Sequence, residues 1–396
     1  MKRFFKFIGS ILGLLIVGVV IIAALNWTTI TNFRRTTEAG VKDVEIFQPR
    51  TIVAGCEAPP LDSFGADTPL PADAFAEMKA YSDGFGGVGL MVLIDGKIAA
   101  EAYSGDADQT TKTFSYSMHK SVMGLLYGAA IADGVIGSID DPIGQYLPGW
   151  ADDPRGQIPL RAFLTMSSGL ESPGFTTLRG LRVNFSSGVT KAALTSPVQS
   201  APLETFEYKG VDSQLAGAAL NAALIKAGKG PYRRYLSEKI WCPIGASDAS
   251  LFPENPEGDP RFYAYLDATL RDWARVGLMV LGNGAFAGEQ LIPAEWVSEA
   301  TASSKTNPIY GLQIWRGTPY VAERAYSTTS PLRVPQKEPF LAEDVIYFDG
   351  FGGQRVYVVP SANMVIVRTG EPTYAWEEST LVNTALRALE TPEGAR

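Results

Sequence analysis

The chain has 396 residues, of which 46% are hydrophobic and 19% charged, and its net charge is −8. This length predicts one large domain or two smaller ones, with ample apolar material for a core. No Lys/Arg-rich run follows the first few residues, so a nucleic-acid partner has little electrostatic basis. The single histidine, His119, excludes any multi-histidine metal site.

The first 25 residues have the pattern of a membrane anchor. Lys2, Arg3 and Lys6 make the start basic, and residues 7–25 are apolar without a charge. A stretch of about 20 apolar residues spans a bilayer as a helix. A cleaved signal peptide is the rival interpretation, but no clear small-residue cleavage site is present. We therefore expect a cytoplasmic tail at 1–6, one transmembrane helix at 7–25, and the remainder on the periplasmic (extracytoplasmic) side of the inner membrane.

Residues 26–70 are mixed in composition and rich in proline towards their end, which predicts a linker. A helix is expected at 73–82. The Gly-x-Gly-x-x-Gly pattern at 84–89 leads into a strand, so it does not predict a dinucleotide site. Asp95-Gly96 then joins strands at 88–94 and 97–103 into a hairpin.

The next helix is expected to begin near Ser117 and to continue to about Ala132. Positions i and i+3 share one face of a helix, so Oγ of Ser117 and Nζ of Lys120 can meet. A desolvated lysine can lose its proton and act as base to a neighbouring serine. His119 lies on the opposite side of the helix, and the chain has no Gly-x-Ser-x-Gly elbow, so a histidine base is not expected.

Beyond this helix the patterns change from helical to extended. From about 140 to 300 they are mainly helical, with helices expected at 213–227, 232–240 and 269–281. Strands are expected at 310–315, 355–359 and 364–368, followed by a closing helix at 376–389. This order predicts an α+β fold: one antiparallel sheet built from both ends of the chain, flanked by helices, with an inserted, mostly helical subdomain.

The chain has two cysteines, Cys56 and Cys242. In an oxidising compartment they can form a disulfide, and otherwise they are separate buried thiols. The residues alone leave both states open.

Five short stretches resemble motifs of the serine β-lactamase and penicillin-binding-protein superfamily, in their order and spacing. They are Ser117-Met-His-Lys-Ser-Val122, Leu164-Thr-Met-Ser-Ser-Gly169, Phe206-Glu-Tyr208, Asn307-Pro-Ile-Tyr-Gly311 and Gly350-Phe-Gly-Gly-Gln354. Within the superfamily the chain is most similar to the class C-type branch, which also holds esterases and 6-aminohexanoate-dimer hydrolases. The resemblance implies a β-lactamase/transpeptidase-like serine hydrolase domain at 71–396, with no metal or organic cofactor.

The resemblance also implies a role for each matching position. Ser117 is expected to form an acyl-enzyme, and Lys120 to accept or relay its proton. Tyr208 is expected to pass protons to the leaving group, with the Lys120 ammonium lowering the pKa of its phenol. The backbone N–H groups of Ser117 and Phe351 are expected to form the oxyanion hole. Substrate contacts are expected from Gly210, Asp349, Gly350 and Gln354.

Two departures from the family pattern concern the substrate. Gly210 stands where the second motif has asparagine, so one contact to a substrate amide is missing. Phe348 stands where a lysine or histidine binds the carboxylate of β-lactams and D-alanyl peptides, although Arg355 can supply a cation nearby. We therefore expect β-lactams and peptidoglycan stems to be poor substrates, and a neutral or amine-bearing ester or amide to be preferred.

The leading hypothesis is a membrane-anchored serine hydrolase acting on a small-molecule or short-peptide amide or ester. One alternative is a D-alanyl carboxypeptidase or β-lactamase. Another is a non-catalytic binding protein that retained the fold. The presence of Ser117, Lys120 and Tyr208 counts against the binding protein, whereas Gly210 and Phe348 count slightly in its favour.

Overall fold

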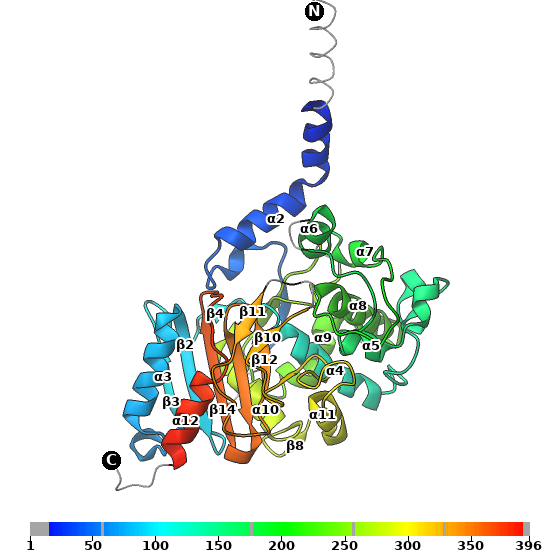
Figure 1. Cartoon of the computed structure of the whole chain (residues 1–396). Coiled ribbons are helices and arrows are strands. Elements are labelled where there is room, and N and C mark those ends of the chain that lie inside the picture. Colours follow the sequence, from blue (N-terminus) through cyan, green and yellow to red (C-terminus); the bar gives the residue numbers. More distant parts are fainter. Residues whose placement is uncertain are drawn as a thin grey trace, which may run out of the picture.

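A six-stranded antiparallel sheet lies at the centre of the computed structural model, which describes residues 16–56, 59–174, 177–255, 258–327, 330 and 332–390. Its strand order is β3-β2-β14-β13-β12-β9 (Figure 1). The bounds are β2 (Gly87–Ile94), β3 (Lys97–Tyr103), β9 (Trp315–Arg316), β12 (Ile346–Gly350), β13 (Gln354–Val359) and β14 (Met364–Gly370). Because β14 pairs with β2, the prediction of a sheet built from both ends of the chain is confirmed.

Helices cover both faces of this sheet (Figure 1). The helices α3 (Ala72–Gly84) and α12 (Thr380–Glu390) pack on one face, and α4 (Met118–Ala132) and α10 (Leu270–Leu281) pack on the other. A hydrophobic core lies on each face of the sheet. Alternate residues of β2 pack into one core or the other, because successive side chains of a strand point to opposite faces. The predicted helical insert at 140–300 is therefore too long, since α10 belongs to the layer that covers the sheet.

The inserted part is mostly helical, as expected. Its helices are α5 (Leu160–Leu164), α6 (Leu178–Phe185), α7 (Val189–Ala193), α8 (Gly210–Lys226) and α9 (Tyr232–Leu236), and α11 (Ala294–Thr301) follows α10. The helix expected at 232–240 is α9 continued by a π-turn, η6 (Ser237–Trp241). Short 3₁₀ turns are η1 (Val44–Ile46), η2 (Gly65–Asp67), η3 (Ile143–Gln145), η4 (Pro148–Trp150), η5 (Pro154–Gln157) and η7 (Pro360–Ala362).

A second, four-stranded sheet has the order β1-β5-β6-β4. Its strands are β1 (Thr51–Val53), β4 (Lys112–Thr113), β5 (Ala249–Leu251) and β6 (Leu266–Thr269). Two short hairpins complete the strands: β7 (Ala285–Phe286) with β8 (Glu289–Gln290), and β10 (Glu323–Ala325) with β11 (Arg333–Pro335).

The strand expected at 310–315 is wrong, because only Trp315–Arg316 is extended. Gln313 has φ 65°, in the left-handed region, which no strand residue adopts. Its side-chain amide donates to the carbonyl oxygens of Phe163 and Leu164, at 3.1 and 2.9 Å. The segment is therefore a loop fastened to α5.

The segment at 26–70 is part of the folded domain, so the predicted linker is wrong. It contains α2 (Trp27–Glu38), whose Thr29 and Asn32 are buried. It also contributes β1, which pairs antiparallel with β5. A disulfide joins Cys56 to Cys242, which resolves the choice that the sequence left open.

The helix Ile16–Leu25 projects from the body of the molecule (Figure 1). Among the described residues, no single helix is long and apolar enough to cross a bilayer. Ile16–Leu25 and α2 meet the length and composition criteria together, but they are bent by 70° relative to each other. The expected cytoplasmic tail at 1–6 and the expected anchor's first residues, 7–15, lie outside the described residues.

Candidate active site

Ser117 is the N-cap of α4 and follows a strained turn. Tyr116, immediately before it, has φ 46°, which is costly for a residue that carries a Cβ. The region around β6 holds this turn in place: the N–H of Leu266 donates to Ser115 Oγ at 2.9 Å, and the N–H of Tyr265 donates to the Tyr116 carbonyl oxygen at 3.2 Å. The turn therefore fixes where the Ser117 side chain enters the site.

Lys120 lies one turn into α4 and points back at Ser117. Its Nζ donates to Ser117 Oγ at 2.8 Å and to the Tyr263 carbonyl oxygen at 2.6 Å. The side chain is buried, and burial lowers the pKa of Lys120 to about 7, against the opposing effect of the Asp349 carboxylate. A lysine with this pKa is about half neutral near pH 7 and increasingly neutral above it, and a neutral amine can take the proton of Ser117.

Tyr208 lies on the other side of this pair. Lys120 Nζ is 5.0 Å from the centroid of the Tyr208 ring. The backbone N–H of Tyr208 donates to the Tyr326 carbonyl oxygen at 2.9 Å. Burial and the Asp349 carboxylate raise the pKa of Tyr208 well above its ordinary value, and they outweigh a hydrogen bond with Ser117 that lowers it. The expectation that Lys120 lowers this pKa is therefore wrong. Lys120 is the group whose pKa falls, and Tyr208 remains a protonated phenol that can donate.

The end of β12 lies against the turn that precedes Ser117. A Cβ on Gly350 would stand 2.4 Å from the Ser115 carbonyl oxygen, so only glycine permits this approach. The ring of Phe351 packs edge-on against Tyr116, with centroids 5.8 Å apart. In the described part of the chain, the backbone N–H groups of Ser117 and Phe351 have no hydrogen-bond acceptor. Free N–H groups beside a nucleophile are what a developing oxyanion requires.

Gly210 begins α8, and two side chains from other segments fill the space beside it. A Cβ on Gly210 would stand 3.3 Å from Asn184 Oδ1 and 3.4 Å from Tyr263 Cγ. Asn184 belongs to α6 and donates through Nδ2 to the Gly180 carbonyl oxygen at 2.7 Å. A side chain at position 210 would therefore pack tightly against both of these residues. Sequence reasoning identified neither Asn184 nor Tyr263.

Asp349 belongs to a buried ion-pair network and is not open to a substrate. Its carboxylate pairs with Arg324 at 3.0 Å and with Arg355 at 2.5 Å. Glu378 pairs with the same two arginines, at 3.0 and 2.6 Å. All four side chains are at most 3% exposed, and their formal charges cancel. The expectation that Asp349 contacts a substrate is therefore wrong, and so is the expectation that Arg355 supplies a free cation, because both side chains are paired inside this network.

Phe348 and Gln354 also lie in the interior. Phe348 is fully buried in the core between the sheet and α4. Nε2 of Gln354 donates to the Gly370 carbonyl oxygen at 2.5 Å, and its Oε1 accepts from the Gly370 N–H at 2.9 Å. Gln354 therefore joins the β12–β13 hairpin to the end of β14, which differs from the expected contact with a substrate.

Glu378→Gln should destabilise the protein by about 3–5 kcal/mol at pH 7, because it leaves a buried arginine charge uncompensated. Burial alone would raise the pKa of Glu378, but the Arg355 and Arg324 guanidinium groups outweigh it and lower the pKa to about 2. A carboxyl group whose pKa is lower in the folded protein than in the unfolded one stabilises the fold at any pH above the pKa of the unfolded state. That stabilisation is lost as the pH falls towards the pKa of the folded state. The difference from wild type should therefore shrink between pH 4.5 and about 2.

Urea unfolding of the two proteins measures this difference. The matched control is Glu338→Gln, because Glu338 pairs with Arg387 at the surface, where the side chains are 40% and 53% exposed. An exposed pair is worth at most about 1 kcal/mol. Equal unfolding midpoints for Glu378→Gln and Glu338→Gln would contradict a stabilising role for the network.

His119 is a core residue. Its Nδ1 lies 3.1 Å from the Ala264 carbonyl oxygen, and its Nε2 lies 3.0 Å from the Tyr232 hydroxyl. Burial lowers the pKa of His119 to about 4. Among the residues that the structure describes, no group of three or more His, Cys, Asp or Glu side chains is arranged to hold a metal ion.

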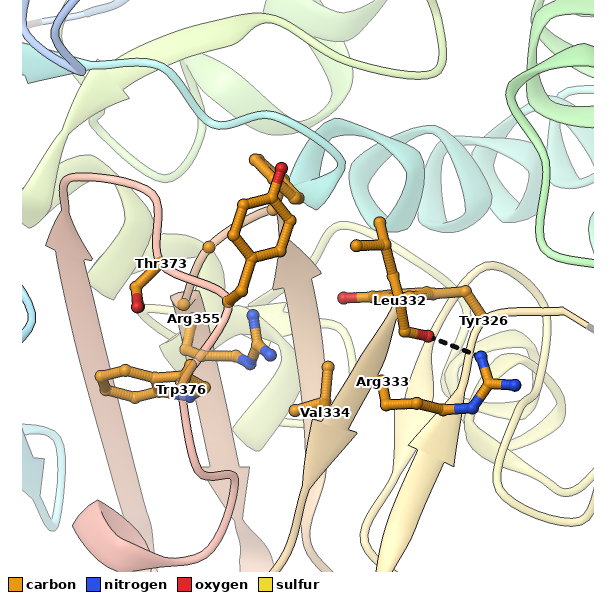
Figure 2. Close-up of a pocket in the computed structure, with 11 residues that line it drawn as sticks. Tyr326, Leu332, Arg333, Val334, Arg355, Thr373 and Trp376 are labelled. Carbon is orange, nitrogen blue, oxygen red and sulfur yellow. Dashed lines mark hydrogen bonds between the residues drawn. The ribbon is translucent and has the colours of Figure 1, made fainter. Parts of the chain in front are cut away.

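A pocket adjoins these groups (Figure 2). Its lining comes from the β10–β11 hairpin region on one side and from the turns after β12 and β14 on the other: Tyr326, Leu332, Arg333, Val334, Phe351, Gly352, Gly353, Arg355, Thr373, Tyr374 and Trp376. The Tyr326 ring lies 5.2 Å from the Tyr208 ring, and Phe351 contacts Tyr116. The pocket therefore lies between Tyr326, which contacts Tyr208, and Phe351, the residue after β12, and four aromatic rings line it.

Comparison with known proteins gives a family and a fold. A family model described as Beta-lactamase matches residues 72–371, and a search of the curated proteins finds no match. The protein described as "Putative 6-aminohexanoate-dimer hydrolase from Bacillus anthracis" has a TM-score of 0.68 at 17% identity, over 88% of this chain and 92% of that one. A penicillin-binding-protein homolog from Caulobacter crescentus has a TM-score of 0.61 at 16% identity, over 85% and 100%. A D-stereospecific amidohydrolase from Streptomyces sp. has a TM-score of 0.56 at 15% identity, over 80% and 98%.

Proposed function

The chain belongs to the beta-lactamase family, and we propose that it is a serine hydrolase that cleaves an ester or amide through an acyl-enzyme on Ser117. One observation carries this proposal. Lys120 Nζ lies 2.8 Å from Ser117 Oγ, and burial lowers the pKa of Lys120 to about 7. A serine beside a neutral lysine is an activated nucleophile.

The reaction then has two halves. Neutral Lys120 takes the proton of Ser117 as Oγ attacks the substrate carbonyl carbon. The N–H groups of Ser117 and Phe351 donate to the oxyanion, and Tyr208 passes a proton to the leaving group while the acyl-enzyme forms. The proton that Lys120 took from Ser117 then returns to the Tyr208 phenolate, which restores the neutral lysine. In the second half Lys120 takes a proton from the water molecule that attacks the acyl-enzyme, and this proton goes back to Ser117 Oγ as the acid product leaves.

The electrostatics of the site favour a substrate without a carboxylate at the end of β12. Phe348 is buried there, and the charges of Arg324 and Arg355 are compensated by acids. Four aromatic rings line the pocket beside Phe351 and can pack against an apolar group, and the partly exposed Arg333 lines it as well. We therefore propose a neutral or amine-bearing small molecule or short peptide as substrate.

A substrate panel tests this preference. We expect turnover of neutral esters or amides, and slow, substoichiometric labelling by a fluorescent penicillin, because the buried Phe348 stands where the family pattern has a cation for the carboxylate. The two assays are run on the same preparation, so that an inactive sample is recognised. Rapid stoichiometric labelling of Ser117 by the penicillin would contradict the substrate class and would favour a β-lactamase or carboxypeptidase.

We propose as well that residues 7–25 anchor the protein in the inner membrane, with the catalytic domain outside the cytoplasm. The basic start of the chain and the exposed apolar side chains of Ile16–Leu25 support this orientation. The disulfide between Cys56 and Cys242 supports an oxidising compartment for the domain. Full-length protein should stay with the membrane pellet after an alkaline carbonate wash, and its release into the supernatant would contradict the anchor.

A further inference from the structure

The bend that follows the helix Ile16–Leu25 is fastened to the catalytic domain. It occurs at Asn26, where the chain turns by 70° into α2. Asn26 Nδ2 donates to the Ile22 carbonyl oxygen at 2.7 Å, and its Oδ1 accepts from Arg182 Nε at 2.9 Å. Since Arg182 belongs to α6, the direction in which Ile16–Leu25 leaves the domain is set by side-chain contacts.

The helix α2 has one face on the domain and one face uncovered. On the inner face, Asn32 Nδ2 donates to the Phe185 carbonyl oxygen at 2.9 Å, and Thr29 is buried. On the outer face, Trp27 is 67% exposed and Ile30 41%, and Phe33, which is 38% exposed, lies at the border of this face and packs edge-on against Phe185. Residues three apart lie along one side of a helix, so these three form an apolar stripe.

The apolar stripe of Trp27, Ile30 and Phe33 is continuous with a larger apolar surface. In Ile16–Leu25 the large apolar side chains of Ile16, Val17, Val19, Val20, Ile21, Ile22 and Leu25 are all more than half exposed. Single exposed apolar residues need no explanation, but an extended apolar surface marks a site that a membrane or another molecule covers. Residues 7–15, which precede this surface, are apolar as well, and Lys2, Arg3 and Lys6 precede them.

We propose that the apolar stripe of α2 lies in the headgroup layer of the same bilayer that residues 7–25 enter. This inference rests on the proposed membrane anchor. Tryptophan is a favoured residue at membrane interfaces, which suits the position of Trp27. The guanidinium group of Arg35 suits anionic headgroups, whereas that of Arg34 pairs with Glu38 at 3.2 Å. A helix with one face in the interface lies along the membrane plane, which fits the 70° bend from a membrane-crossing segment.

The consequence for the active site follows from α6. Phe185 contacts α2, and the adjacent Asn184 stands against Gly210 and Tyr263, which border Tyr208 and Lys120. The side of the active site formed by α6 is therefore held next to the membrane surface.

Fluorescent labels on the full-length protein in phosphatidylcholine–phosphatidylglycerol vesicles test the proposal. Single cysteines replace Val20, Ile30 or Leu341, and each carries an environment-sensitive nitrobenzoxadiazole label; the native cysteines are paired and do not react. Leu341 is the matched control, because it is 47% exposed and its N–H bonds to Asn383 of α12, at the end of the molecule opposite α2 (Figure 1). Hydrolysis of a soluble ester at the wild-type rate shows that the labelled proteins are folded.

We expect a label at position 30 to have blue-shifted emission and to be quenched most by nitroxide at the headgroups. A label at position 20 should be quenched most by nitroxide deep in the acyl chains, and one at 341 by neither. If position 30 behaves as position 341 does, the inference is wrong, whatever position 20 shows. If only position 20 fails to be quenched, the interfacial helix stands and the transmembrane anchor fails.

Discussion

Replacing Ser117 with alanine should reduce ester and amide turnover by at least about a thousandfold, because no acyl-enzyme can form without the nucleophile. Release of p-nitrophenol from the acetate and butyrate esters measures the effect as kcat. The fold should be retained, because among the described residues Ser117 Oγ bonds only to Lys120 and Tyr208, and thermal unfolding checks this.

The matched control is Ser121→Ala in the same helix. Ser121 is more deeply buried than Ser117, and its Oγ donates to the Gln313 carbonyl oxygen at 2.7 Å. This variant should hydrolyse the esters at close to the wild-type rate. Equal turnover by wild type and Ser117→Ala would instead favour a binding protein that has kept the fold.

Lys120→Ala should lower kcat by about 10²–10⁴-fold, the usual contribution of a general base. In the wild type, burial lowers the pKa of Lys120 to about 7, so the base is protonated and inactive below that pH. The rate should therefore rise with pH through about 7 and then level off. A series of kcat measurements from pH 5 to 9 gives this profile.

Lys120→Arg should be nearly as poor as Lys120→Ala, because a guanidinium stays protonated at these pH values and cannot accept the serine proton. The exposed Lys97, on the β2–β3 hairpin, offers a control in which loss of a lysine charge leaves activity unchanged. A loss below about tenfold for Lys120→Ala would place the base elsewhere, since general bases contribute more than this.

Local parts of the site could be predicted from sequence because their geometry depends on a few neighbouring residues. The i, i+3 spacing of Ser117 and Lys120 brings their side chains together on any helix. Likewise, Asp95-Gly96 is a strong turn signal, and both residues have the positive φ that the turn needs, 47° and 76°.

The surroundings of this pair could not be predicted because distant segments supply them. Asn184 and Tyr263 occupy the space beside Gly210, and Arg324 and Glu378 complete the ion-pair network of Asp349. No spacing rule links these residues in the sequence. Only the packing of the insert and the late strands on α4 brings them to the site.

The protonation states also depended on burial, which sequence does not give. Pairing of charges suggested a lowered pKa for Tyr208, but burial lowers the pKa of Lys120 and raises that of Tyr208. Composition was misleading in the same way at 26–70. Its prolines are typical of a linker, yet α2 and β1 are held by tertiary contacts and by Cys56.

Labelling with a fluorophosphonate tests the central claim most directly, because the reagent records both which residue is the nucleophile and which pH activates it. Peptide mass spectrometry should find one adduct, on Ser117, with a labelling rate that rises through about pH 7 and is at least tenfold lower in Lys120→Ala. An adduct on another residue, or a rate on Ser117 that is the same at pH 5 and pH 9, would contradict a serine nucleophile activated by neutral Lys120.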